Sequence, residues 1–185
     1  MKIISGKYAG RKIITVGKTR PPLVRIRQNI FDLLPDLEGF TVLDLCAGSG
    51  SLGLEAISRG AKMVYFFEED REVAQNLIQT LKKWGITNAQ VAMSNVQYLP
   101  HAKVKVDLVF FDPPFGHNYV KEVCTKVLSK GWTTPETILV VRTNERQANM
   151  TGWIQIHSKA IGASHTYFYY REDSPKILDI VDNFK

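Results

Sequence analysis

Cysteine, histidine and long apolar runs are scarce in this chain, and each scarcity excludes a class of protein. The two cysteines, Cys46 and Cys124, lie far apart in apolar segments, so we expect free thiols rather than a disulfide framework. The four histidines are scattered, and no metal is expected. No apolar run approaches the roughly 20 residues that cross a bilayer, and residues 1–5 are too short and polar for a signal sequence. We therefore expect a cytoplasmic protein with no membrane partner.

Acidic residues are absent from the first 27 positions. This segment holds eight of the 24 basic residues and none of the 18 acidic ones, which leaves the remainder at −2. A basic segment on a mildly acidic body favours a polyanionic partner, because clustered Lys and Arg neutralise phosphates. A solvated basic edge and a transit peptide are the alternatives. The relevant basic positions include Lys7, Arg11, Lys12, Arg20, Arg25 and Arg27.

Apolar strands alternate with amphipathic helices from residue 41 onward. The pattern predicts strands over 41–46, 62–69, 89–94, 106–112 and 136–143, with helices over 51–60, 71–85 and 118–131. A hairpin around Gly162 follows. This order is typical of an α/β, Rossmann-like fold with a mostly parallel seven-stranded sheet, helices on both faces and a C-terminal antiparallel hairpin.

The remaining segments complete a single expected domain. The N-terminal part reads as two short strands, near residues 3–4 and 12–16, followed by a helix within "PPLVRIRQNIFDLLP" that carries Arg25 and Arg27 on or beside its polar side. With 185 residues, 44% of them hydrophobic, the chain can bury one sizeable core. We expect an N-terminal extension over 1–35, a core over 36–171 and a tail over 172–185.

Glycines follow the first predicted strand of the core. In "DLCAGSGSLGLEA", residues 44–56, Gly48, Gly50 and Gly53 form G-x-G-x-x-G, which by itself is weak evidence for a dinucleotide. Asp44 stands before this turn, where its charge would oppose a pyrophosphate. A carboxylate at this place suits a ligand with a cationic amino group, although it can also simply cap the next turn.

A second carboxylate, Glu68, ends the next strand twenty residues beyond Gly48. Such a carboxylate can accept both hydroxyls of a ribose, in an NAD-type ligand or in any adenosine. Together with Asp44 it favours a nucleoside that bears an ammonium group and no phosphate, which describes S-adenosylmethionine. Asn95 follows the third strand, where its amide can approach an adenine or act as an ordinary cap.

A rigid acidic turn, Asp112-Pro113-Pro114-Phe115, ends the fourth strand of the core. The two prolines fix two φ angles and remove two backbone donors. The Asp112 carboxylate and the Pro113 carbonyl can each accept one hydrogen of a nucleobase amine, while Phe115 stacks on the base. A proline-rich turn with an incidental acid is the alternative.

Taken together, "DLCAGSGSLGLEA", "FFEED", "SNVQYL" and "FFDPPF" resemble class I S-adenosylmethionine-dependent amino-methyltransferases. With "KIISGKYAGRKI" and "TRPPLVRIRQNIFDLL", residues 1 to about 171 resemble the RsmD family, which methylates a guanine N2 in bacterial 16S ribosomal RNA. The usual T-R-P-T-S-D-R-V-R-E of that family reads T-R-P-P-L-V-R-I-R-Q here.

The resemblance implies an enzyme, its cofactor S-adenosylmethionine and the residues that bind each partner. Residues implied to bind the cofactor are Asp44, Ala47, Gly48, Ser49, Gly50, Glu68, Glu69, Asn95, Val96 and Asp112. Residues implied to hold the guanine are Asp112, Pro113, Pro114 and Phe115. Residues implied to face 16S rRNA, naked or in a small-subunit assembly particle, are Lys7, Arg11, Lys12, Arg20, Arg25 and Arg27.

Several alternatives stay open. Methylation of adenine N6 or cytosine N4 in another RNA or in DNA would use the same acidic turn. A nucleotide-dependent oxidoreductase and a non-catalytic RNA-binding module are further possibilities. The oligomeric state is open, with a monomer as the expectation.

Overall fold

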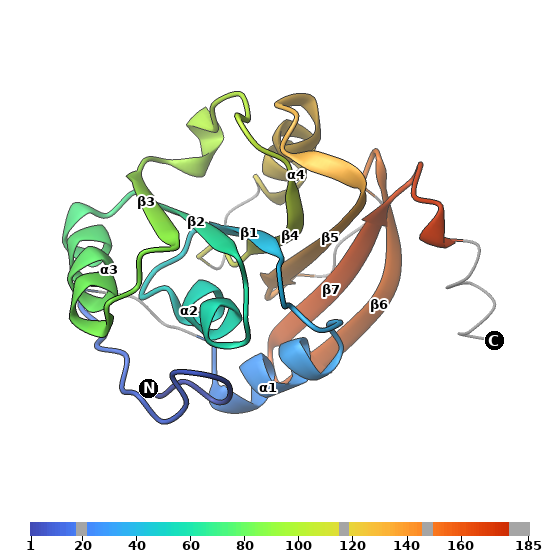
Figure 1. Cartoon of the computed structure of the whole chain (residues 1–185). Coiled ribbons are helices and arrows are strands. Elements are labelled where there is room, and N and C mark those ends of the chain that lie inside the picture. Colours follow the sequence, from blue (N-terminus) through green and yellow to red (C-terminus); the bar gives the residue numbers. More distant parts are fainter. Residues whose placement is uncertain (18–21, 115–118, 146–149, 178–185) are drawn as a thin grey trace. The chain divides into compact units, whose positions relative to one another are not determined.

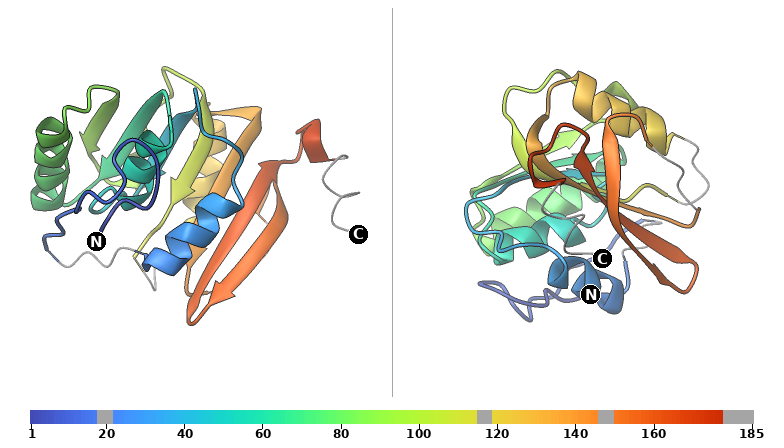
Figure 2. Two further views of the ribbon diagram at one scale, coloured as in Figure 1. Left: turned by 60° about the horizontal axis from the view of Figure 1, so that its bottom comes forward. Right: turned by 90° about the vertical axis from the view of Figure 1, so that its right-hand side faces the viewer.

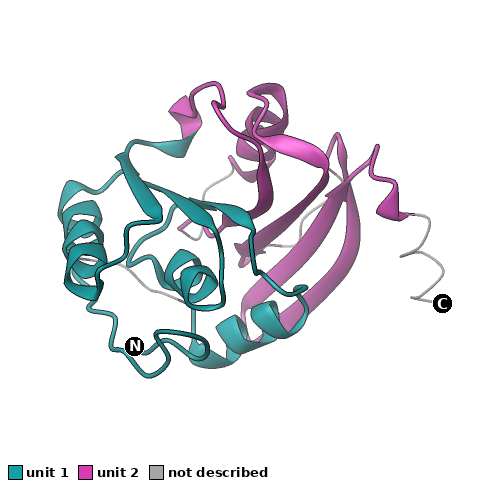
Figure 3. Ribbon diagram, in the orientation of Figure 1, with its two compact units in different colours: residues 1–96 teal, residues 97–185 magenta. Residues whose placement is uncertain are grey.

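The computed structural model describes residues 1–17, 22–114, 119–145 and 150–177 (Figure 1). Within it the chain forms two compact units, Met1–Val96 and Gln97–Lys185 (Figure 3), which we describe one at a time. Two residues with predicted roles, Arg20 and Phe115, lie outside the described residues, as does the end of the predicted tail from 178.

Unit 1 contains three parallel strands. They are β1 (Thr41–Leu45), β2 (Met63–Glu68) and β3 (Ala89–Met93), in the order β3-β2-β1. The parallel register pairs Leu45 with Phe67 and Glu68 with Met93. The carboxyl ends of all three strands therefore meet at one edge, where ligands bind in sheets of this kind.

The helices of unit 1 are α1 (Val24–Asp32), α2 (Ser51–Ser58) and α3 (Arg71–Trp84), and a short 3₁₀ turn, η1 (Val96–Tyr98), begins at its end. Every residue of α2 is buried, as expected of a helix that is apolar on most sides. The side chain of Asp70 caps α3 by accepting from the N–H groups of Glu72 and Val73. Gly85 ends α3 in the left-handed conformation, with φ +67°.

The N-terminal segment is a looped hairpin whose predicted strands shrink to one antiparallel bridge, Lys2 with Lys12. It lies beside α2 in Figures 1 and 2. The N–H of Lys7 donates to the Ser58 carbonyl (2.7 Å), and the N–H of Tyr8 donates to the Ser58 hydroxyl (2.9 Å). Backbone hydrogen bonds also cross the hairpin, from the Ile3 N–H to the Arg11 carbonyl (3.0 Å) and from the Ile13 N–H to the Met1 carbonyl (2.8 Å), but they make up only this one bridge.

Arg27 departs from its predicted place. The expectation that it lies on or beside the polar side of the helix and faces RNA is wrong, because its side chain is 0% exposed. Its Nη2 donates to the Lys2 carbonyl (2.6 Å), and Nη1 lies 3.9 Å from Glu55 Oε2. Arg27 therefore joins α1, α2 and the N-terminal hairpin inside unit 1, whereas Arg25 on the same helix is exposed.

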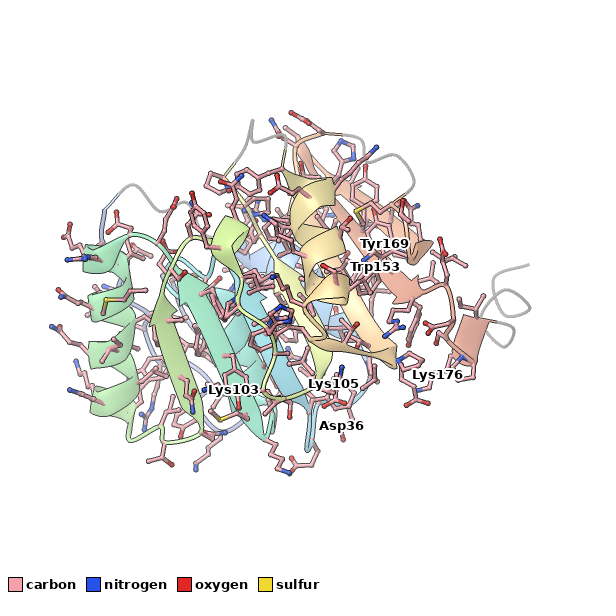
Figure 4. The ribbon with its side chains drawn as sticks, turned by 90° about the horizontal axis from the view of Figure 1, so that it is seen from above. Asp36, Lys103, Lys105, Trp153, Tyr169 and Lys176 are labelled. Carbon is pink, nitrogen blue, oxygen red and sulfur yellow. The ribbon has the colours of Figure 1, made fainter. Side chains whose placement is uncertain are left out.

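Unit 2 contains four strands and one long helix. The elements are β4 (Val106–Phe111), α4 (Val120–Ser129), β5 (Thr133–Thr143), β6 (Trp153–Ile161) and β7 (Ser164–Arg171). The strand order is β4-β5-β7-β6; β4 is parallel to β5, and the β6–β7 hairpin is antiparallel throughout. Buried Trp153 and Tyr169 of the hairpin lie near α4 (Figure 4), and Trp153 Nε1 donates to the Cys124 carbonyl at 3.3 Å.

The two units together confirm the predicted fold class. The seven strands of the described residues form a mixed, mostly parallel sheet, with strand and helix alternating until the final hairpin. No helix in the part of the chain that the structure describes is long and apolar enough to cross a membrane.

Candidate functional site

The glycine turn after β1 is shaped by unusual backbone angles. Cys46 has φ +58°, Gly48 +56° and Gly50 +75°. These positive φ angles lie in the left-handed region, which residues other than glycine rarely adopt. The turn stays attached to β2, because the Ala47 N–H donates to the Phe67 carbonyl at 3.0 Å. A Cβ at Gly50 would lie 2.5 Å from Leu77 Cδ1. The turn thus requires glycine both for its angles and for its closeness to α3.

Asp44 lies beneath this turn and is 1% exposed. Its Oδ2 accepts from the N–H of Gly53 in the first turn of α2, at 2.9 Å. A Cβ at Gly53 would meet the Phe66 ring at 2.2 Å and Asp44 Oδ2 at 2.9 Å. The structure therefore gives Asp44 the capping role that the sequence left open, and its contact with a cofactor ammonium group stays a prediction.

The ends of β2 and β3 bring the other predicted cofactor residues together. Glu68 Oε2 accepts from the Gly48 N–H at 2.7 Å, and its Oε1 accepts from the Asp70 N–H at 2.9 Å. Next to it, Glu69 Oε2 accepts from Asn95 Nδ2 at 2.6 Å. Since a carboxylate has about four lone-pair sites, Glu68 can still accept ribose hydroxyls.

Ser49 places a buried hydroxyl in the glycine turn. Its side chain is 3% exposed, and its Oγ has no hydrogen-bond partner among the described residues. Buried hydroxyls are nearly always hydrogen-bonded, so the Ser49 hydroxyl is suited to form a hydrogen bond with a polar group of a ligand. Ala47 is half-buried and Val96, which begins η1, is buried. These residues of unit 1 fit a nucleoside ligand such as S-adenosylmethionine.

The acidic turn in unit 2 has a partner that the sequence did not reveal. Asp112 directly follows β4, with Pro113 buried and Pro114 exposed. Both carboxylate oxygens face the guanidinium of Arg142 on β5: Nε lies 2.7 Å from Oδ1, and Nη2 donates to Oδ2 at 2.9 Å. Arg142 lies 30 residues away and matches no motif, so only strand pairing could have found it.

The electrostatics of Asp112 follow from its burial. Desolvation raises its pKa to about 6, against the opposing charge and hydrogen bond of Arg142. Near neutral pH the carboxylate is therefore mostly ionised but poised close to protonation. The residues that the structure describes contain no group of three or more His, Cys, Asp or Glu arranged to hold a metal.

A parallel sheet with a glycine turn after its first strand and a carboxylate at the end of its second defines a Rossmann-like protein that binds a nucleotide or nucleoside. More specifically, the chain belongs to the family described as "Conserved hypothetical protein 95", whose profile matches residues 1–170.

Named relatives support this assignment. "Ribosomal RNA small subunit methyltransferase D" of Haemophilus influenzae is 33% identical over 88% of this chain and 89% of its own length. The solved yhhF protein of Escherichia coli is 33% identical, with TM-score 0.85, over 94% of this chain and 98% of that chain. The resemblance to the RsmD family is thereby confirmed.

A more distant solved structure shares the fold alone. It is an RNA methyltransferase from Salinibacter ruber in complex with S-adenosyl-L-homocysteine, 16% identical with TM-score 0.65, covering 86% of this chain and 99% of that chain.

Proposed function

We infer that this protein is an S-adenosylmethionine-dependent methyltransferase that acts on the exocyclic N2 amine of a guanine in 16S rRNA. The observation that carries this inference is family membership over residues 1–170, with a relative named ribosomal RNA small subunit methyltransferase D that aligns along most of both chains. The rigid acidic turn at residues 112–114 is the chemical feature that supports amine methylation.

The cofactor is bound by the strand ends of unit 1. Glu68 accepts the ribose hydroxyls, Asn95 and Val96 flank the adenine, and the glycine turn with the Ser49 hydroxyl receives the amino-acid end. When bound, S-adenosylmethionine supplies a methyl group on a positively charged sulfur. The absence of side chains at Gly48 and Gly50 lets the backbone approach such a ligand closely.

The acidic turn orients the amine of the target base. The lone pair of an exocyclic amine is delocalised into the ring, so the nitrogen is a weak nucleophile. The Asp112 carboxylate and the Pro113 carbonyl each accept one N–H, which directs the lone pair toward the methyl group. Alignment of this kind can lower a barrier by about 7–11 kcal/mol. Once methylated, the nitrogen is cationic and loses its proton readily. The stacking of Phe115 on the base stays a prediction from the sequence, because Phe115 lies outside the described residues.

The basic N-terminal hairpin and the exposed Arg25 of α1 contact the RNA. Lys7, Arg11, Lys12 and Arg25 are exposed, and the Arg11 guanidinium lies 4.9 Å from the centre of the Tyr8 ring. Lys and Arg on one segment neutralise backbone phosphates. Arg27 is not part of this surface because it is buried. The substrate is either naked 16S rRNA or a cytoplasmic small-subunit assembly particle.

The activity is tested by transfer of a radiolabelled methyl group to small-subunit particles and to naked rRNA, followed by nucleoside mass spectrometry. We expect label in N2-methylguanosine. Label in N6-methyladenosine, in a methylated cytidine or in DNA would contradict the guanine assignment. Asp112→Ala should abolish turnover while calorimetry still detects cofactor binding. Loss of binding in that variant would instead make Asp112 a cofactor ligand.

The RNA surface is tested with two arginines of the same helix. Arg25→Ala should reduce the slope of log affinity against log salt by about 0.7–0.9 for each phosphate that the protein no longer neutralises. Arg27→Met is the matched control: it removes the same charge from a buried position and should leave the slope unchanged. Equal changes in both variants would exclude a direct contact by Arg25.

A further inference from the structure

Arg142 faces the acidic turn because of strand register. Strands β4 and β5 are parallel with Phe111 opposite Val141, so the next residues, Asp112 and Arg142, come side by side where β4 ends. The guanidinium meets both carboxylate oxygens, with the Nε–Oδ1 distance 2.7 Å and the Nη2–Oδ2 distance 2.9 Å. The first contact is an ion pair outside hydrogen-bond geometry and the second is a hydrogen bond, and together they hold the carboxylate at both of its oxygens.

The other side of Arg142 is held by the C-terminal hairpin. Arg142 lies opposite Thr166 on β7, and its Nη1 is 3.4 Å from the hydroxyl of Ser164 at the start of that strand. Arg142, Ser164 and Thr166 are all buried. The guanidinium is therefore enclosed between β7 and the acidic turn, and the long side chain keeps little freedom.

We propose that Arg142 is a positioning residue for methyl transfer. It holds the Asp112 carboxylate in place and favours its ionised form, so that the remaining lone pairs of the carboxylate accept an amine hydrogen of the target base. This inference rests on the proposed function. A carboxylate has about four lone-pair sites; the Arg142 hydrogen bond occupies one on Oδ2, and Nε lies 2.7 Å from Oδ1 as an ion-pair contact. The sites that remain lie in the plane of the carboxylate that Arg142 holds.

The charges around Asp112 support this role. Burial favours the neutral acid, which would offer a donor where the amine needs an acceptor, and Arg142 counteracts that preference. On α4, Glu122 and Lys126 form an ion pair with each other. On β7, His165 lies opposite Thr143 and stacks on Tyr167.

The test compares Arg142→Met, which removes the charge, with Arg142→Lys, which keeps the charge without the contacts to both carboxylate oxygens. For each protein the dependence of kcat/KM on pH is measured with rRNA substrate between pH 5 and 9. Cofactor affinity and thermal stability are measured over the same range. The Asp112 carboxyl is also titrated directly by NMR after ¹³C labelling of aspartate.

In the wild type we expect the acidic limb of kcat/KM to have its midpoint near the Asp112 pKa of about 6. Without the arginine, the midpoint and the NMR titration should both move up by about 1–3 pH units. Turnover near pH 7 should fall by about 10²-fold and recover in part at pH 9, with cofactor affinity unchanged. The lysine variant should keep the acidic limb near its wild-type place with an intermediate turnover.

Three results overturn the inference and can be told apart. If the wild type is active and Arg142→Met keeps both the wild-type pH profile and the wild-type carboxyl titration, Arg142 does not act through Asp112, and the proposed function stands. A loss of turnover that is equal at every pH also counts against positioning and indicates a merely structural residue. If the wild type transfers no methyl group to any rRNA substrate, the proposed function itself fails, and the inference falls with it.

Discussion

Glu55 and Arg27 form a buried ion pair whose two members should contribute unequally to stability. Both side chains are 0% exposed, with Arg27 Nη1 3.9 Å from Glu55 Oε2. Glu55 has three closer partners: its Oε2 accepts from the Ile4 N–H at 2.7 Å, and its Oε1 accepts from the Ser5 N–H and from Arg59 Nε, both at 3.0 Å. Replacing Glu55 by Gln removes the counterion of Arg27 and turns one of the two accepting oxygens into an NH2 group that faces another donor.

Arg27 is bonded far less completely. Its Nη2 donates to the Lys2 carbonyl, but Nε and Nη1 have no hydrogen-bond partner among the described residues. Burial lowers its pKa, against the opposing effect of Glu55. If Arg27 is replaced, Glu55 still pairs with Arg59, and the cost of burying an incompletely bonded guanidinium disappears.

We therefore expect Glu55→Gln to lower the free energy of unfolding by about 3–5 kcal/mol. Arg27→Met should lower it by about 1 kcal/mol, because the loss of one hydrogen bond is offset by relief from desolvation. In the Arg27→Met background, Glu55→Gln should cost less, with a coupling of about 0.5–3 kcal/mol. Urea denaturation followed by tryptophan fluorescence measures all four proteins of the cycle. Equal costs for the two single variants, or costs that simply add, would refute this reasoning.

Three further predictions follow from backbone contacts and from the acidic turn. Gly6→Ala should destabilise more than Gly10→Ala in urea denaturation: both have φ near +80°, which costs about 1–2 kcal/mol, but only a Cβ at Gly6 would lie 1.8 Å from the Ser58 carbonyl oxygen. Equal losses would mean that the hairpin is not docked on α2. The pKa of Asp112 is about 6 in the folded protein and about 3.9 in the unfolded chain. Its contribution to the free energy of unfolding, up to about 3 kcal/mol, is therefore fully present below pH 3.9 and is lost as the pH rises through 6. Asp112→Asn should remove this loss, and unfolding curves at pH 4 and pH 8 that keep the same offset from wild type would contradict it. Gly53→Ala should weaken S-adenosylmethionine binding by about tenfold or more in calorimetry, because a Cβ would lie 2.2 Å from a ring on β2; unchanged affinity would exclude the glycine turn from the site.

The order of elements was predictable from the sequence because each strand and helix carries its own periodicity. Strand β2 was expected over 62–69 and spans Met63–Glu68, and the hairpin around Gly162 forms as expected. Gly48 and Glu68, twenty residues apart in the sequence, are hydrogen-bonded to each other, and the role of Glu68 in binding a ribose stays a prediction. These features depend on local pattern and on the fact that parallel strands end at one edge.

Contacts that depend on tertiary packing were not predictable. Arg27 looked like a polar residue of a surface helix, but α1 turns that position toward Glu55 on α2, 28 positions further along the chain. Arg142 carries no motif, and its role follows only from the register of β4 and β5. A buried charge needs a partner of opposite charge or a hydrogen-bonding group, and a single sequence does not show which distant residue provides it.

The docking of the hairpin on Glu55 and Ser58 has a practical consequence for anyone who shortens this protein. A truncation that discards the first dozen residues strips the carboxylate of Glu55 of its two backbone donors and uncovers a helix that is otherwise enclosed. Weak RNA affinity in such a shortened protein would reflect a damaged interior as much as missing positive charge. Substitutions at exposed Lys7 or Arg11 leave those backbone donors in place and are the sounder test of whether the N-terminal hairpin binds RNA.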